Sequence, residues 1–128
     1  MKTFSRILNL IRRSNTFESG DAPSADVVTY FQAGLAIPTP NPATFSSDPA
    51  QNGVGGATMT ASLATGLGQI EYFFKCRETP QFDSGWQTSR IYAPTGLTSG
   101  SDYNFSCQSR NQSHAVTRPS AYKSVTVL

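Results

Sequence analysis

The segment Leu97-Thr98-Ser99-Gly100-Ser101-Asp102-Tyr103 is the stretch that decides the fold of this chain. A leucine ends one expected strand, a polar turn with a glycine follows, and a tyrosine six positions later opens the alternating run Tyr103, Phe105, Cys107. This spacing is typical of a tyrosine corner in a Greek-key β-sandwich. Leu97 and Tyr103 are therefore predicted to define an all-β fold.

The chain on both sides of this corner alternates between short strands and turns, as in an all-β sandwich. The first strand is expected to begin at 43–46, and further strands are expected at 57–63, 70–76, 86–88, 90–93, 103–110 and 121–128. The side chains expected to face the core on the second and third strands are Ala57, Met59, Ala61, Leu63, Ile70, Tyr72, Phe74 and Cys76. Residues 42–128 are thus predicted to form a seven-stranded Greek-key sandwich.

Residues 1–41 have a different character and are predicted to form an N-terminal arm. Apolar residues at i, i+3, i+4 and i+7 within residues 3–13 predict a short amphipathic helix. From residue 15 to 42 the composition shifts to Ser, Asp, Ala, Thr and Pro, and the cluster at 38–42 predicts an extended, polyproline-like segment. The run at 27–31 is β-prone and could pair with a sheet edge in this chain or in a neighbour, or form an ordinary extra edge strand.

The apolar stripe of so short a helix must be covered, because a helix of this length is marginal in water. Docking against protein is the preferred interpretation, with loose disorder and a membrane interface as alternatives. No apolar run approaches the roughly 20 residues of a transmembrane helix. The residues expected to form an assembly interface are Phe4, Ile7, Leu8, Ile11, Val27, Val28, Tyr30 and Phe31.

The composition argues against several classes of function. Only 14% of the residues are charged, against about 25% in typical soluble domains, and a net charge of +2 offers no general support for nucleic-acid binding. His114 is the only histidine, and the acidic residues are scattered through turns. No catalytic residue, cofactor or metal site is therefore expected. Polarity supplied by Ser, Thr, Asn and Gln suits a secreted or surface-displayed β-protein.

The two cysteines, Cys76 and Cys107, both fall at inward-facing positions of expected strands. They are either two buried, inert thiols or a disulfide pair. A disulfide would close a loop of about 30 residues and stabilise the fold by roughly 3 to 4 kcal/mol. It would also imply an oxidising compartment or a virion exterior.

Four aromatic residues lie outside the inward-facing series, on or near the third strand and the loop after it: Phe73, Phe82, Trp86 and Tyr92. Three interpretations remain open for them. They could form a subunit interface, where aromatic anchors concentrate, they could belong to the core of the second sheet, or they could stack on sugar rings.

Residues 42–128 resemble a bacterial fibronectin type III domain. The resemblance rests on the third strand IEYFFKC at 70–76, the turn DSGWQ at 83–87, the run YAPTGL at 92–97 that leads into the corner, and the sixth strand YNFSCQSRN at 103–111. The chain departs from the family at the second strand, where the small series Ala57, Met59, Ala61 replaces a buried tryptophan. Trp86 is expected to fill part of that space.

This resemblance implies an immunoglobulin/fibronectin III-like sandwich in which the third and sixth strands are neighbours, so that Cys76 lies beside Cys107 and a disulfide between them is favoured. Such domains usually act as spacers, adhesive modules or display platforms. We therefore expect a non-enzymatic structural subunit on the surface of a large assembly, anchored by its arm and forming a homo-oligomer.

The expected setting is a virion, with the chain as a decoration, fibre or cement protein, or else an extracellular filament or surface layer. The alternative is a carbohydrate-binding or adhesive module. Neither a nucleic acid nor a membrane is expected as a partner.

Overall fold

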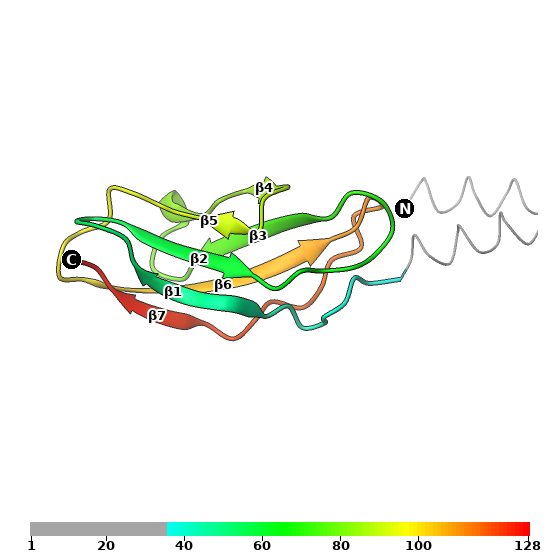
Figure 1. The fold of residues 1–128 in the computed structure, drawn as a ribbon, viewed down its shortest axis with the longest axis horizontal. Helices are drawn as coiled ribbons and strands as arrows, with labels where there is room; N and C mark the ends of the chain where they lie inside the picture. The colour runs from blue at the N-terminus through cyan, green and yellow to red at the C-terminus, as the bar shows by residue number, and fades with distance from the viewer. Residues whose placement is uncertain (1–35) are drawn as a thin grey trace, which may run out of the picture. The chain divides into compact units, whose positions relative to one another are not determined.

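The computed structural model describes residues 36–128, which form one unit, Ala36–Leu128. Its strands are arranged in two antiparallel sheets, with β1-β2-β5 in one and β4-β3-β6-β7 in the other (Figure 1). The elements are β1 (Phe45–Gln51), β2 (Ala57–Ala61), β3 (Glu71–Cys76), the one-turn helix η1 (Pro80–Phe82), β4 (Trp86–Gln87), β5 (Ile91–Tyr92), β6 (Asp102–Arg110) and β7 (Lys123–Thr126). The predicted all-β class is confirmed.

The core lies between the two sheets and is built from alternate residues of the longer strands, since successive side chains of a strand point to opposite faces. Its buried members are Ala57, Met59 and Ala61 from β2, Tyr72, Phe74 and Cys76 from β3, and Tyr103, Phe105 and Cys107 from β6, with Leu97, Val125 and Val127 beside them. The inward-facing series predicted for β2 continues to residue 63, but β2 ends at Ala61 and the Leu63 side chain is 65% exposed.

The small residues of β2 leave room that aromatic rings fill. Tyr92 stacks on Phe74 with ring centroids 5.5 Å apart, and its ring meets Phe105 edge-on at 6.4 Å. Phe45 approaches Phe74 at 6.3 Å from β1. The expectation that Trp86 fills this space is wrong, because Trp86 pairs with Phe73, whose side chain faces away from the core.

The tyrosine corner ties three distant parts of the chain together. The Tyr103 hydroxyl accepts a hydrogen bond from the Thr98 backbone N–H at 3.0 Å. Leu97 is buried, and its backbone N–H donates a hydrogen bond to the Gly55 carbonyl at 2.9 Å. The Gly55 N–H in turn donates to the Leu128 carbonyl at 3.0 Å. The corner therefore fixes the turn between β1 and β2 and the end of the chain at once.

The segment 36–42, which its composition placed mainly in the arm, packs on the sandwich. Thr39 and Thr65 exchange two backbone hydrogen bonds of 3.0 and 2.9 Å, and their hydroxyl groups lie 2.9 Å apart. Pro38 is among the fully buried side chains, and the Asn111 side chain donates to the Ala36 carbonyl at 3.0 Å. The chain bends at residues 40–42, so the predicted extended, polyproline-like segment is not found there.

The two sheets have short or irregular edges. β1 contains Pro49 and register shifts in its pairing with β2, and the Gln51 side chain donates to the Thr126 carbonyl of β7 at 2.7 Å. At the other side, the Gln87 side chain donates to the Ile91 carbonyl at 2.9 Å. Proline, bulges and side chains that occupy backbone groups all oppose the addition of a further strand.

We predict that Tyr103→Phe lowers the free energy of unfolding by about 1 to 2 kcal/mol, because the Thr98 N–H loses its acceptor while the ring stays in place. The measurement is urea denaturation followed by tryptophan fluorescence. Tyr122→Phe is the matched control, since the Tyr122 ring is 39% exposed and its contact with Arg77 involves the ring face. Equal stability of the Tyr103→Phe variant and the unchanged protein would contradict the structural role of the corner.

Candidate functional site

The outer face of the four-stranded sheet carries a row of large side chains from three adjacent strands. Phe73 of β3 is paired in register with Trp86 of β4 on one side and with Gln108 of β6 on the other. The Phe73 and Trp86 rings lie 5.4 Å apart between centroids and are tilted by 60°. Both side chains are half-buried.

Arg110 of β6 completes this row. Its guanidinium carbon lies 4.3 Å from the centroid of the Trp86 ring. Its Nε donates to Glu71 Oε1 at 2.9 Å, and its Nη2 is 2.9 Å from the same oxygen. The pairing of Glu71 with Arg110 in the β3–β6 register places the two charges on the same face. We call Glu71, Phe73, Trp86 and Arg110 the outer-face cluster.

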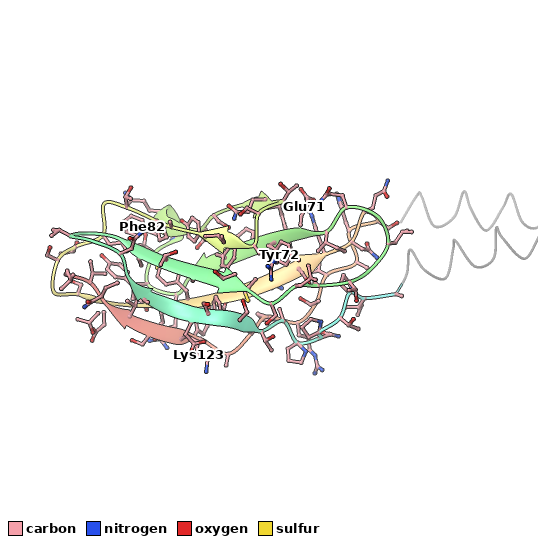
Figure 2. The ribbon with its side chains drawn as sticks, viewed as in Figure 1. Glu71, Tyr72, Phe82 and Lys123 are labelled. Carbon is pink, nitrogen blue, oxygen red and sulfur yellow. The ribbon has the colours of Figure 1, made fainter. Side chains whose placement is uncertain are left out.

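In this cluster one face of the Trp86 ring is already covered by the Arg110 guanidinium. A guanidinium over a tryptophan ring contributes about 0.5 to 2 kcal/mol, more when water is excluded, and here Glu71 holds the guanidinium in place. A sugar ring could stack on that face of Trp86 only by displacing Arg110. Figure 2 shows Glu71 at the outside of the sandwich while the next residue, Tyr72, lies between the sheets.

Phe82 and Tyr92 do not belong to this face. Phe82 packs edge-on against Tyr103 with ring centroids 5.7 Å apart, and the Tyr92 hydroxyl donates to the Phe82 carbonyl at 2.6 Å. Burial raises the pKa of Tyr92, and the negative charge of Asp83 adds to that rise. Of the four aromatic residues singled out in the sequence, Phe73 and Trp86 therefore lie on the outer face, and Phe82 and Tyr92 pack against the core.

Cys76 and Cys107 are not bonded to each other in the structure. Both are buried free thiols, so the expected disulfide is not present. The physical reason is register: Cys76 lies opposite Phe105, and Cys107 lies opposite Phe74, which makes the cysteines diagonal neighbours on adjacent strands. The Cys107 thiol instead donates to the Thr44 carbonyl at 3.4 Å.

The Cys107 thiol is kept protonated by its surroundings. Burial raises its pKa to about 11, although a side-chain hydrogen bond with Ser120 acts in the opposite direction. A thiolate is the reactive form of cysteine. Cys107 is therefore a structural residue at neutral pH.

We predict that the stability of the protein falls as the pH rises through the interval between an ordinary cysteine pKa of about 8.5 and the value of about 11 in the folded chain. In this interval the unfolded chain has lost the thiol proton and the folded chain still holds it, so alkali favours unfolding. Below the interval this contribution is fully present. Urea denaturation at several pH values measures the slope.

Cys107→Ala serves as the control for this slope, because it removes the thiol and leaves every other titrating group. Its stability should be less sensitive to pH between the same limits, whatever its stability at neutral pH. Identical pH slopes in the two proteins would contradict the raised pKa. The Cys107 thiol should also resist Ellman's reagent at neutral pH until the protein is unfolded.

The acidic residues of the loops act as hydrogen-bond acceptors. Asp83 Oδ1 accepts from the Cys76 backbone N–H at 2.8 Å. Glu78 accepts hydrogen bonds from the backbone N–H and the side-chain amide of Asn104. Burial raises the pKa of Glu78, but these hydrogen bonds and Arg77 outweigh it, so that the pKa lies below its usual value.

Within residues 36–128, no group of His, Cys, Asp and Glu side chains could hold a metal ion. Over the same range, no helix is long and apolar enough to cross a membrane. The residues expected to form the assembly interface, which are Phe4, Ile7, Leu8, Ile11, Val27, Val28, Tyr30 and Phe31, lie outside the described range.

Sequence reasoning missed two charged members of the outer-face cluster, Glu71 and Arg110. Alternation along the strands places both residues on the face opposite the core, but their pairing depends on the β3–β6 register. A search for opposite charges on the outer faces of the third and sixth strands could have suggested the pair.

No protein-family model matches the chain, and no curated protein sequence matches it significantly.

Proposed function

We propose that this chain is a non-enzymatic structural subunit, in which a fibronectin type III-like sandwich is displayed on the surface of a large assembly and is anchored by the N-terminal arm. The proposed setting is a virion, with the chain as a decoration, fibre or cement protein, or else an extracellular filament or surface layer. Its partners are other copies of the chain and neighbouring proteins of the assembly.

Several features support the seven-stranded Greek-key, fibronectin III-like part of the proposal. The chain passes from one sheet to the other between β2 and β3, between β4 and β5, and again between β5 and β6. The third and sixth strands are neighbours, as the resemblance implies. The hydrogen bond between Tyr103 and Thr98 is that of a tyrosine corner.

The observation that carries the display function is that the segment next to the arm and the C-terminus lie at opposite ends of the sandwich. Residues 36–42 lie at one end of the long axis and Leu128 at the opposite end (Figure 1). Gly55 and Ser99 both donate hydrogen bonds to the Leu128 carbonyl, so their loops lie at that far end. A domain held through residue 36 would therefore present these loops away from its point of attachment.

The short and irregular sheet edges of the sandwich favour anchoring by the arm, because they oppose the addition of another strand. Gln51, Pro49 and Gln87 all reduce the chance that another strand adds to the described sheets. The apolar stripe and the β-prone run predicted in residues 1–35 then supply the surface for contacts with the assembly. Low charge in the chain as a whole is compatible with a surface-displayed protein.

The test compares three chains by analytical ultracentrifugation and urea denaturation: the full chain, the chain from Ala36 to Leu128, and a chain from residue 43 to 128. We expect the full chain to sediment as an oligomer and the chain starting at Ala36 to be a folded monomer. The chain starting at residue 43 should also be a monomer, but less stable by about 2 kcal/mol or more, because it lacks buried Pro38 and the Thr39–Thr65 bonds.

Each chain tests a different part of the proposal. A full chain that sediments as a monomer would contradict the assembly role. Oligomers of the chain starting at Ala36 would show that the sandwich, and not the arm, makes the contacts. Equal stability of the two shortened chains would contradict the structural part given to residues 36–42.

A carbohydrate-binding or adhesive function is the second candidate, and the half-exposed pair of Phe73 and Trp86 on the outer face favours it. We expect the full chain to bind no glycan on a glycan array, because Arg110 already covers one face of Trp86. Binding that disappears in Trp86→Ala and persists in Phe82→Ala, with both variants folded, would instead support the second candidate.

A further inference from the structure

An open depression of about 540 Å³ lies beside the start of β3. It is bordered by the chain between β2 and β3 and by the loop that joins β4 to β5. Its lining residues are Leu63, Ala64, Gly68, Gln69, Ile70, Tyr72, Thr88 and Arg90. None of them belongs to the outer-face cluster.

The apolar part of this depression is exposed to solvent. The Leu63 side chain is 65% exposed, and Ile70 is a half-buried residue packed against the core. A single exposed leucine is common on protein surfaces. Here it borders a concave surface that also contains a buried hydroxyl and a cation.

The buried hydroxyl belongs to Tyr72. Its side chain is only 3% exposed, and the hydroxyl accepts a hydrogen bond from the Ala64 backbone N–H at 3.0 Å. A phenol hydroxyl can also donate one hydrogen bond. The described residues supply no acceptor for that hydrogen, so a ligand in the depression could accept it.

The cation is Arg90, which is the one charged side chain among the lining residues. Its Nη1 donates to the Ala61 carbonyl at 3.4 Å. Within the part of the chain that the structure describes, the ion pairs are Arg77–Glu78 and Arg110–Glu71, so Arg90 has no carboxylate partner there. An anion is therefore the complementary ligand.

We propose that this depression binds an apolar carboxylate, meaning a hydrocarbon about the size of a side chain that ends in a carboxylate group. The carboxylate accepts hydrogen bonds from the Arg90 guanidinium and the Tyr72 hydroxyl, and the hydrocarbon covers Leu63 and Ile70. This chemistry occurs in a free short-chain organic acid and at a peptide C-terminus whose last residue is apolar. Every residue of this site lies within residues 36–128, and the proposal does not rest on the assembly proposed above.

Other classes of ligand satisfy fewer of these groups. A neutral apolar molecule would cover Leu63 and Ile70 but would leave Arg90 without a counter-charge. Inorganic phosphate would pair with Arg90 but would leave the apolar part of the depression in water. Only a ligand with both parts uses the hydroxyl, the cation and the apolar surface together.

The test is a titration of the ¹⁵N-labelled full chain followed by the backbone amide signals of Ala64, Gly68, Gln69, Ile70 and Thr88. The probes are hexanoate, N-acetyl-leucine and the uncharged N-acetyl-leucine amide. We expect at least one of the acids to shift these signals, and the amide to bind at least about tenfold more weakly than N-acetyl-leucine if that acid binds. Binding of hexanoate alone identifies a free acid as the ligand, and binding of N-acetyl-leucine alone identifies a peptide C-terminus.

Two variants that each remove one positive charge test whether Arg90 itself contributes to binding. Arg90→Gln should weaken binding of the acid by at least about tenfold, as expected for loss of a charge-assisted hydrogen bond. Arg118→Gln removes an exposed cation that does not line the depression, and it should leave the affinity unchanged. Tyr72→Phe should also weaken binding, and its folding is checked by its amide spectrum.

The proposal is overturned if neither acid shifts these signals at about 10 mM, or if the amide binds as tightly as N-acetyl-leucine. It is also overturned if Arg90→Gln and Arg118→Gln weaken binding equally, since the effect would then be one of general charge. If Tyr72→Phe does not fold, the comparison of the two arginine variants still tests the proposal. Sedimentation of the full chain reports on the assembly separately, so the two proposals can fail independently.

Discussion

The antiparallel pairing of β3 with β6 is the constraint on which the rest of the sandwich depends. It runs from Glu71 opposite Arg110 to Cys76 opposite Phe105. Because side chains alternate along both strands, this one register decides which residues enter the core and which reach the outer face. A slip by one residue would turn each strand's buried set toward solvent.

The same register accounts for features that look unrelated in the sequence. On the inner side it brings Phe74 opposite Cys107, so the two thiols are diagonal and remain free. On the outer side it brings Glu71 to Arg110, and the guanidinium held there lies over Trp86 of the neighbouring strand. Core and surface are thus set by a single pairing in the middle of the four-stranded sheet.

Alternation along the chain was enough to predict much of the fold. The buried series Ala57, Met59, Ala61 and the series Tyr72, Phe74, Cys76 follow the expected two-residue period. Periodicity does not state where a strand ends, and so Leu63 was expected inside although it follows the end of β2.

The candidate site was less predictable, because it depends on the directions in which loops and short strands point their side chains. Phe73 was recognised as lying outside the inward series, since it sits on a long alternating strand. Phe82 and Tyr92 lie on a one-turn helix and a two-residue strand, where no period exists, and both turn toward the core. Composition likewise could not show that Pro38 is buried in the sandwich.

The placement of the segment 36–42 and the C-terminus at opposite ends of the long axis has a mechanical consequence. Tension applied between these two points acts along the strands, so it loads the β1–β2 and β6–β7 pairings in shear. In that geometry the hydrogen bonds of a strand pair must break together instead of one after another. The sandwich is therefore oriented to resist being pulled apart.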